Sequence, residues 1–442
     1  MHMQDKKDLE EFEEQFLEES DEEHEFSKAR FKAVGFDFFA YFLSILISIV
    51  IGAGVGAYAT AFAMLINLIT GFRQEHMWLI FLLPAGGVLI VLFYHLLKTY
   101  EPVGTNGVLQ SISSDTDLPI KMTPLITVGT AITHLFGGSA GREGAALQIG
   151  GSLGTSLAHL LKFPKKETII LTLCGMSAAF SAMFGTPLTA TIFAMEVVSI
   201  GIIHYSAIVP CAVSALTASL IARLMGYGAD VFPKVDFPTF TWLYGLKAIL
   251  FGIACALVST LFCLLLKKSA SFMKKYIENP YYRTILGGIL IVILTMIFGT
   301  SDYNGSGINI IYAALSGNAV WYSFIAKAVM TAITLAACYK GGEIIPTLFI
   351  GATFGCFFGP LIGIPASVGA ALGMGGVFCG VTNCPITSIV LCFEIFGVKG
   401  LPMVLLVAAV SYRLSGYYGI YSGQKIMYSK SRPLFINRST WK

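Results

Sequence analysis

The chain has 442 residues, of which 55% are hydrophobic and only 12% are charged, whereas soluble domains average about 25% charged residues. Twelve of the 26 acidic residues lie between positions 5 and 25, so the rest of the chain is poorer still in charge. This composition excludes a soluble globular domain, and no basic patch interleaved with aromatic residues indicates a nucleic-acid partner. We therefore expect an all-α integral membrane protein surrounded by the lipid bilayer.

The chain order predicts three regions. An acidic cytoplasmic N-terminal tail covers residues 1–34 and lacks the apolar core of a signal peptide. The transmembrane region covers 35–424, and a short basic cytoplasmic C-terminal tail covers 425–442. Lysine and arginine residues precede the first apolar run and follow the last, so the positive-inside rule places both ends of the chain in the cytoplasm. We expect the protein in the cell membrane.

The transmembrane region contains apolar runs of two kinds. Apolar runs recur at 40–64, 78–97, 248–266 and 285–298, and the longer of them are near the roughly 20 residues that cross a bilayer as a helix. Other runs are short, as at 403–414, or interrupted by glycine and proline, as at 348–364. Such segments are tolerated in a membrane only where protein or a watery cavity surrounds them. These short or interrupted runs therefore predict helices that enter the membrane without crossing it.

An internal repeat divides this region into halves at about 35–235 and 240–420. Residues 187–196 and 385–394 both start with proline, carry threonine at the third position and end with glutamate. Upstream, glycine, phenylalanine and proline at 175, 180 and 187 correspond to the same residue types at 373, 378 and 385. Repeats of this kind in membrane proteins fold as two similar halves around a site near the bilayer midplane. The repeat alone leaves open whether the halves are inverted.

Two glycine-rich segments at equivalent positions are candidates for that site. Residues 141–144 read Gly-Arg-Glu-Gly, and residues 342–346 read Gly-Glu-Ile-Ile-Pro. Glycine allows close backbone approach, and proline suits the first turn of a helix. Each segment therefore predicts a helix start with free N–H groups, which carry roughly half a positive elementary charge. Two converging starts would bind an anion, and a carboxylate beside them would compete for the same place when ionised.

These motifs resemble those of the CLC family of chloride channels and halide/proton antiporters. Residues 141–145 are similar to the family's Gly-Arg/Lys-Glu-Gly-Pro, with alanine for proline, and 342–346 to its Gly-x-Phe-x-Pro, with isoleucine for phenylalanine. Residues 104–108 are only faintly similar to its Gly-Ser-Gly-Ile-Pro. The resemblance runs from about residue 36 to 425. It implies an inverted-repeat homodimer with many tilted and re-entrant helices, one pathway per subunit, and halide ions and protons as the transported species.

The resemblance also implies roles for individual residues. Glu143 corresponds to the external gating glutamate, and Glu343 is a second candidate for carrying protons. We expect Arg142 to orient the site or to contact a carboxylate. The candidate anion-binding residues are Thr105, Asn106, Arg142, Gly144, Ile344, Ile345 and Tyr421.

The chain departs from the chloride exchangers of the family in one respect. Those exchangers carry two adjacent glutamates after the Pro-Leu turn, whereas this chain reads Glu196-Val197. The missing acid is typical of the family's channels and of its fluoride-transporting branch, which also carries a glutamate equivalent to Glu343. That branch has threonine where this chain has Ile345. We expect a proton-coupled transporter with fluoride modestly preferred over chloride.

Two other functions remain open on sequence alone. An uncoupled chloride channel would move no protons. An intramembrane protease would use Ser139 as nucleophile and His204 as base, but would leave the repeat unexplained. We expect no cofactor, and histidines 134, 159 and 204 share no spacing with carboxylates or cysteines that would indicate a metal site. For Glu196 and Glu394, which occupy equivalent repeat positions, we expect a structural role.

Overall fold

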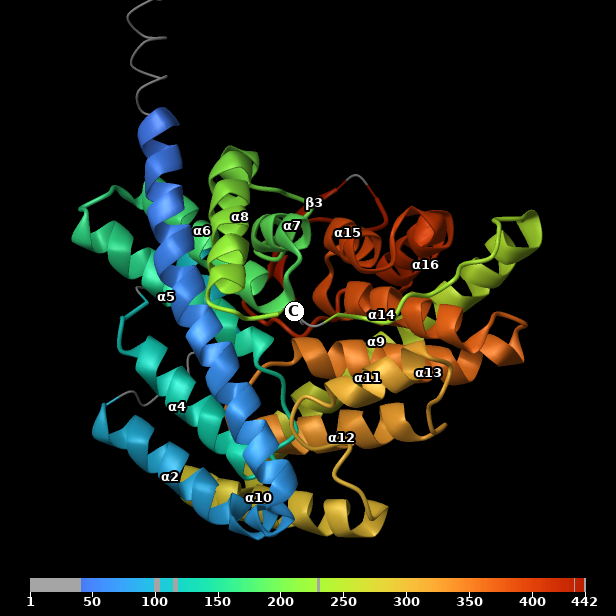
Figure 1. The fold of residues 1–442 in the computed structure, drawn as a ribbon, viewed down its shortest axis with the longest axis horizontal. Helices are drawn as coiled ribbons and strands as arrows, with labels where there is room; N and C mark the ends of the chain where they lie inside the picture. The colour runs from blue at the N-terminus through green and yellow to red at the C-terminus, as the bar shows by residue number, and fades with distance from the viewer. Residues whose placement is uncertain (1–40, 99–103, 114–117, 229–230, 433, 441–442) are drawn as a thin grey trace, which may run out of the picture. The chain divides into compact units, whose positions relative to one another are not determined.

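The computed structural model describes residues 41–98, 104–113, 118–228, 231–432 and 434–440 (Figure 1). The chain falls into two units, residues 1–48 and 49–442. The first unit contributes only the first turns of the helix Tyr41–Glu75 to the described residues. The predicted acidic tail, residues 1–34, lies outside the described part of the chain.

Helices dominate both halves of the repeat. After Tyr41–Glu75, the first half contains η1 (Met77–Leu82), α2 (Leu83–Leu96), α3 (Thr105–Ser113), α4 (Met122–Leu135), α5 (Glu143–Leu160), α6 (Lys165–Phe184), α7 (Pro187–Glu196), β1 (Ser199–Ile200), η2 (Tyr205–Ala207) and α8 (Ile208–Leu224). The second half contains α9 (Trp242–Tyr276), α10 (Pro280–Phe298), α11 (Ile308–Leu315), α12 (Ser323–Ala336), α13 (Ile344–Leu361), α14 (Ala366–Thr382), α15 (Pro385–Phe396), η3 (Val398–Gly400) and α16 (Leu401–Leu414). Strands β2 (Lys425–Tyr428) and β3 (Phe435–Ser439) follow.

Seven described helical segments are long and apolar enough to cross a membrane. They are Tyr41–Glu75, Met77–Leu96, Lys165–Phe184, Tyr205–Leu224, Trp242–Tyr276, Pro280–Phe298 and Ile344–Leu361. Two of them, α6 and α13, are mostly buried inside the protein, whereas the others expose more of their apolar surface. The prediction of a helical, multi-pass membrane protein is confirmed.

The repeat is visible in the packing of equivalent helices. Helix α5 packs closely on α6, and α13 packs closely on α14. A Cβ added at Gly150 would lie 2.2 Å from the carbonyl oxygen of Gly175, and one added at Gly351 would lie 2.3 Å from that of Gly373. These four glycines are equivalent in the two halves, and small residues at such crossings let membrane helices approach closely.

Helices α7 and α15 show that the two halves are related by a two-fold axis. The Glu196 carboxylate, at the end of α7, accepts from the backbone N–H groups of Ile386 (3.1 Å) and Thr387 (2.8 Å) at the start of α15. Reciprocally, Glu394 on α15 accepts from Leu188 N–H (2.9 Å) and Thr189 N–H (2.7 Å) on α7. The end of each helix therefore lies at the start of the other. The helices are antiparallel, and the axis that exchanges them runs across them, as an inverted repeat requires.

A small sheet, which the sequence analysis did not predict, joins the C-terminal residues to the first half. Strand β2 pairs in parallel with β1 and in antiparallel with β3. Gln424, just before β2, is fully buried and donates to the backbone oxygens of Val197 (2.9 Å) and Thr382 (3.0 Å). The chain that follows α16 is thereby fixed against the ends of α7 and α14.

Candidate anion site

The two predicted glycine-rich segments meet through their backbones. Gly141 N–H donates to Gly342 O at 2.8 Å and Gly342 N–H donates to Gly141 O at 2.7 Å, which forms an isolated antiparallel bridge. A Cβ added at Gly342 would lie 2.4 Å from the nitrogen of Gly144, and one added at Gly144 would lie 2.7 Å from the Cα of Gly342. Glycine is required here for close approach. Helices α5 and α13 therefore start side by side, each two residues after the bridge.

The start of α5 is occupied by the carboxylate of its own first residue. Glu143 is 3% exposed, and its Oε2 atom accepts from the backbone N–H of Arg142 at 3.0 Å. A Cβ added at Gly141 would lie 2.8 Å from the same oxygen. An anionic group is stabilised at a helix start, where free N–H groups carry partial positive charge. The carboxylate of Glu143 therefore uses the kind of donor that a bound anion would use.

The start of α13 presents a second carboxylate and two backbone N–H groups for which no acceptor is seen among the described residues. Ile344 and Ile345 are buried in the first turn, and the next residue, Pro346, has no N–H group to offer. Glu343 is half-buried, and its enclosed Oε2 atom has no hydrogen-bond partner among the described residues. That oxygen would lie 3.5 Å from a Cβ added at Gly144. The side chain of Glu343 thus reaches from the start of α13 to the first turn of α5.

The Thr105 hydroxyl lies beside the same turn. Its Oγ1 atom would also lie 3.5 Å from a Cβ added at Gly144, and it donates to Gly144 O at 3.4 Å. The Gln148 side chain, on α5, donates to Thr105 Oγ1 at 3.1 Å. Gln148 is not among the site residues predicted from the sequence, although a glutamine in an apolar helix is a recognisable signal. The structure therefore brings Thr105, Gly144 and Glu343 together, with Gln148 as support.

Tyr421, a predicted anion-binding residue, is buried in the segment that follows α16. The residue is 1% exposed, and its hydroxyl has no hydrogen-bond partner among the described residues. The Glu343 carboxyl is near enough to act electrostatically on this phenol. A buried hydroxyl without a partner is costly, and an anion would accept a hydrogen bond from it. Asn106 differs, because its Oδ1 accepts from Gly423 N–H at 3.1 Å and anchors the segment that carries Tyr421.

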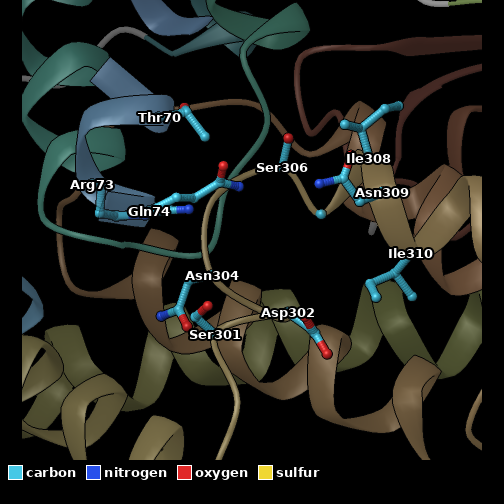
Figure 2. Close-up of a pocket in the computed structure, with 11 residues that line it drawn as sticks. Thr70, Arg73, Gln74, Ser301, Asp302, Asn304, Ser306, Ile308, Asn309 and Ile310 are labelled. Atoms are coloured by element: carbon cyan, nitrogen blue, oxygen red, sulfur yellow. The ribbon is translucent and has the colours of Figure 1, made fainter. Parts of the chain in front are cut away.

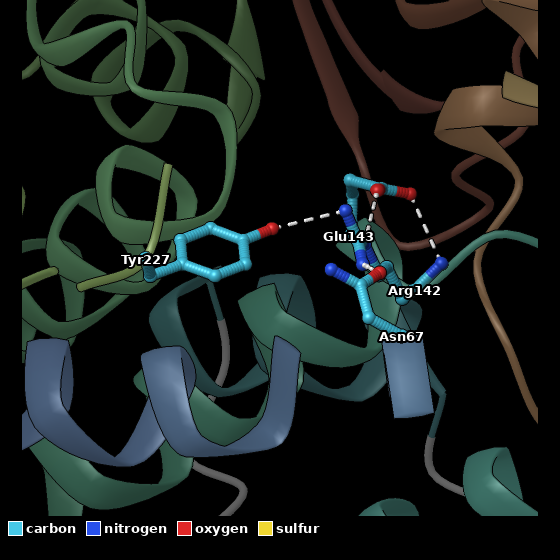
Figure 3. A network of polar contacts seen from close by, with 4 residues as sticks. All are labelled: Asn67, Arg142, Glu143 and Tyr227. Atoms are coloured by element: carbon cyan, nitrogen blue, oxygen red, sulfur yellow. Dashed lines mark hydrogen bonds and ion pairs between the residues drawn. The ribbon is translucent and has the colours of Figure 1, made fainter. Parts of the chain in front are cut away.

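The guanidinium of Arg142 contacts the side chains of Asn67, Tyr227 and Glu143 (Figure 3). It donates to Asn67 Oδ1 and to Tyr227 Oη at 3.0 Å, and its Nε lies 3.4 Å from Glu143 Oε1. Arg142 thus contacts the carboxylate of Glu143, and its assignment to the anion-binding residues stays a prediction. Asn67 and Tyr227 lie far apart in the sequence, and no motif marks them.

The residues of the protease alternative are not assembled. Ser139 is fully buried, and its Oγ shares a 3.1 Å hydrogen bond with Thr331 Oγ1. His204 lies between β1 and η2 and makes no hydrogen bond with Ser139 in the described structure. A nucleophile without a base in reach is not activated. In the part of the chain that the structure describes, no three His, Cys, Asp or Glu residues could hold a metal ion.

Comparisons with known proteins show the family of this chain. The family model of the voltage-gated chloride channels matches residues 86–416. A protein of Pseudomonas syringae pv. tomato named a chloride/fluoride channel protein is 33% identical over 383 residues, 84% of either chain. The crystal structure of a CLC-type fluoride/proton antiporter is 32% identical, with a TM-score of 0.85 over 88% of this chain and 99% of that chain.

A more distant structure supports the fold alone. A slow cyanobacterial Cl⁻/H⁺ antiporter is 21% identical, with a TM-score of 0.75 over 84% of this chain and 94% of that chain. The family match covers most of the transmembrane region and includes both glycine-rich segments. The resemblance drawn from the sequence motifs is thereby confirmed, and this chain belongs to the voltage-gated chloride channel family, the CLC proteins.

Proposed function

We propose that this protein is a transmembrane halide transporter that exchanges halide ions for protons and prefers fluoride to chloride. The observation that carries the proposal is that two carboxyl groups, those of Glu143 and Glu343, lie at the two helix starts joined by the glycine bridge. A halide ion would lie between these starts, near the buried hydroxyl of Tyr421. Partial charges hold an anion weakly enough for it to leave again.

Glu143 supplies the route from anion binding to proton movement. When ionised, its carboxylate takes a backbone donor at the start of α5 and competes with the halide. When protonated, it no longer gains from that positive end, so the halide displaces it. Each exchange of carboxylate for halide therefore takes up or releases a proton.

Glu343 is the better candidate for the second proton-carrying group. Glu196, its rival, accepts three hydrogen bonds from Ile386 and Thr387 and so serves the start of α15. Val197 stands where the chloride exchangers have their second acid. The Oε2 atom of Glu343 has no partner among the described residues and lies at the site itself. Proton transfer needs a titratable group within reach of the exchanging charge, and Glu343 meets that condition.

The preference for fluoride rests on the relatives. The two with about one-third identity are named for chloride/fluoride and for fluoride/proton transport, whereas the H(+)/Cl(-) exchange transporter of Salmonella agona is 28% identical. We further infer that the protein works as a homodimer in the cell membrane with both termini in the cytoplasm, in keeping with the family resemblance and the positive-inside pattern.

The test is reconstitution of the full chain into liposomes, with fluoride, chloride and proton movement recorded in parallel. An outward fluoride gradient should drive protons inward against their own gradient, and chloride should do so more slowly. Glu143→Gln should move the anion without protons, because its side chain cannot titrate. Glu343→Gln should slow coupled transport. Glu167→Gln, at an exposed position at the start of α6, serves as the matched control and should behave as wild type.

Two results would contradict the proposal. Wild-type protein that moves halide without protons would be an uncoupled channel, the alternative that the name of the Pseudomonas relative favours. Anion-driven proton uptake that persists in Glu143→Gln would remove Glu143 from the coupling mechanism.

A further inference from the structure

A polar pocket, lined in part by exposed side chains, lies at the end of the helix Tyr41–Glu75 (Figure 2). Its volume is about 80 Å³, enough for a small ion with some of its water. Three segments line it: the last turns of that helix with Arg73 and Gln74, the connection between α10 and α11 with Asp302 and Ser306, and the first turn of α11 with Asn309. In Figure 2 the amide groups of Gln74 and Asn309 extend toward one another from opposite sides of this cavity.

Arg73, a cation that lines the cavity, has no carboxylate partner among the residues that the structure describes. Arg73 is 6% exposed, and its described hydrogen bond goes to the backbone oxygen of His134 at 3.1 Å. No carboxylate of a described residue forms an ion pair with it. An arginine stays charged in a protein, and a buried charge without a counter-ion is costly. The guanidinium therefore favours an anion in the cavity that it lines.

Helix α11 adds backbone donors to the same cavity. Gly307 precedes the helix with a φ of 75°, and the first backbone bonds into it are Ile310 N–H to Gly307 O at 3.0 Å and Ile311 N–H to the same oxygen at 3.4 Å. The N–H groups of Ile308 and Asn309 precede these bonds and have no backbone partner in the described structure. Free donors at a helix start attract anions, and here they act beside a buried guanidinium.

The connection between α10 and α11, which lines the cavity, also contacts the segment that precedes the paired helix starts. Asn304 Nδ2 donates to Gly137 O at 2.7 Å, and Gly305 N–H donates to Gly138 O at 2.9 Å. From there the chain reaches the bridge at Gly141 in three residues. On the other side, the fully buried Lys327 donates to Gly305 O at 2.6 Å and to Tyr303 O at 3.1 Å. The segment that lines the cavity is thus hydrogen-bonded to the segment that leads to the candidate anion site.

We propose that this cavity is a second anion site, which binds the transported halide before or after its passage between the helix starts. The proposal rests on the proposed function only in taking a halide as the ligand. Its donors are Arg73, the Gln74 and Asn309 amides and the start of α11, and among the described residues that line it only Asp302 carries a carboxylate. Cationic groups around a passage raise the local concentration of anions and the rate of their arrival.

The test changes charge in the cavity without changing side-chain shape. Ser306, whose hydroxyl makes no described hydrogen bond, is replaced by Asp in one variant and by the isosteric Asn in another. Asp302→Asn makes the opposite change. A unit charge a few ångströms from the ion, in a largely aqueous setting, alters binding roughly three- to tenfold. The chloride or fluoride concentration that half-saturates the flux should therefore rise by that factor in Ser306→Asp relative to Ser306→Asn. In Asp302→Asn this concentration should fall relative to the wild type.

The same variants give a direct readout of binding. Crystals of the wild type and of Ser306→Asn, soaked in bromide, should show an anomalous peak in the cavity that Ser306→Asp lacks. A wild-type map without that peak would overturn the proposal. Equal half-saturating concentrations in Ser306→Asp and Ser306→Asn would overturn it too. So would a difference between these two variants that is confined to the maximum rate of transport. The ratio of protons to halide should be unchanged in all three variants, so a failure of coupling in the wild type is a separate result.

Discussion

Replacing Glu196 by glutamine separates a structural acid from a proton-carrying one. Glu196 is 6% exposed, and its Oε2 atom accepts from Thr387 N–H at 2.8 Å and from Thr387 Oγ1 at 2.6 Å. Its Oε1 atom accepts from Ile386 N–H at 3.1 Å. Glutamine keeps the Oε1 acceptor but turns an NH₂ group toward the two Thr387 donors.

The loss can be estimated from these contacts. A hydrogen bond to a charged group contributes about 1.5–3 kcal/mol, and two such bonds are removed. The Thr387 hydroxyl can rotate to accept from the new NH₂ group, so we expect a loss near the lower end, about 3 kcal/mol of unfolding free energy. Glu394→Gln breaks the equivalent contact to Thr189, at a less buried position. We expect it to cost about half as much.

Both quantities can be measured on the same preparations. The free energy of unfolding is followed in detergent micelles for the wild type, Glu196→Gln and Glu394→Gln, and the ratio of protons to fluoride is followed in liposomes. We expect both variants to be destabilised and to keep the wild-type ratio. If Glu196→Gln were as stable as the wild type but moved no protons, Glu196 would be the inner proton acceptor and the structural argument would be refuted.

Three further predictions concern stability and binding. Gly144→Ala and Gly342→Ala should each prevent assembly of active protein, because the new Cβ would lie 2.7 Å or 2.4 Å from backbone atoms, whereas Gly54→Ala, with no atom within 4 Å, should fold normally in an expression and size-exclusion assay. Tyr421→Phe should leave unfolding unchanged but weaken halide binding measured by calorimetry, because its hydroxyl has no described protein partner. Burial lowers the pKa of Lys430 from its ordinary 10.5 to about 8, so between these pH values the unfolded chain binds this proton and the folded chain does not. The free energy of unfolding should therefore rise from about pH 8 toward pH 10.5. It should vary less with pH in Lys430→Met, which lacks the titrating amine.

The glycine-rich segments and the repeat could be predicted from the sequence because their information is local. Spacing alone aligned Gly141 with Gly342, and the structure joins these two residues by backbone bonds. Glycine and proline at helix starts have few other uses inside a membrane, so the position of α5 and α13 followed from residue type.

The side chains around the site could not be predicted in the same way. The partners of Arg142 come from segments some 75 and 85 residues away, and only the fold brings Asn67 and Tyr227 to it. The cavity beside Arg73 is likewise assembled from separate segments. The sheet escaped prediction because β1 has two residues and its partner strands follow the last helix. A strand that short carries no periodic pattern.

The contacts between the halves have a consequence for how the protein arose. Gly141 forms backbone hydrogen bonds with its own counterpart Gly342. Glu196, at the end of α7, accepts from the start of α15, and Glu394 on α15 accepts from the start of α7. Contacts between equivalent residues about a two-fold axis are self-complementary, so two identical chains satisfy them as fully as two halves of one chain do. A half-length ancestor could therefore have formed the same anion site as a dimer of two separate chains. Later fusion of the two genes would then have freed each copy to diverge, as Arg142 and Glu343 have done at aligned positions.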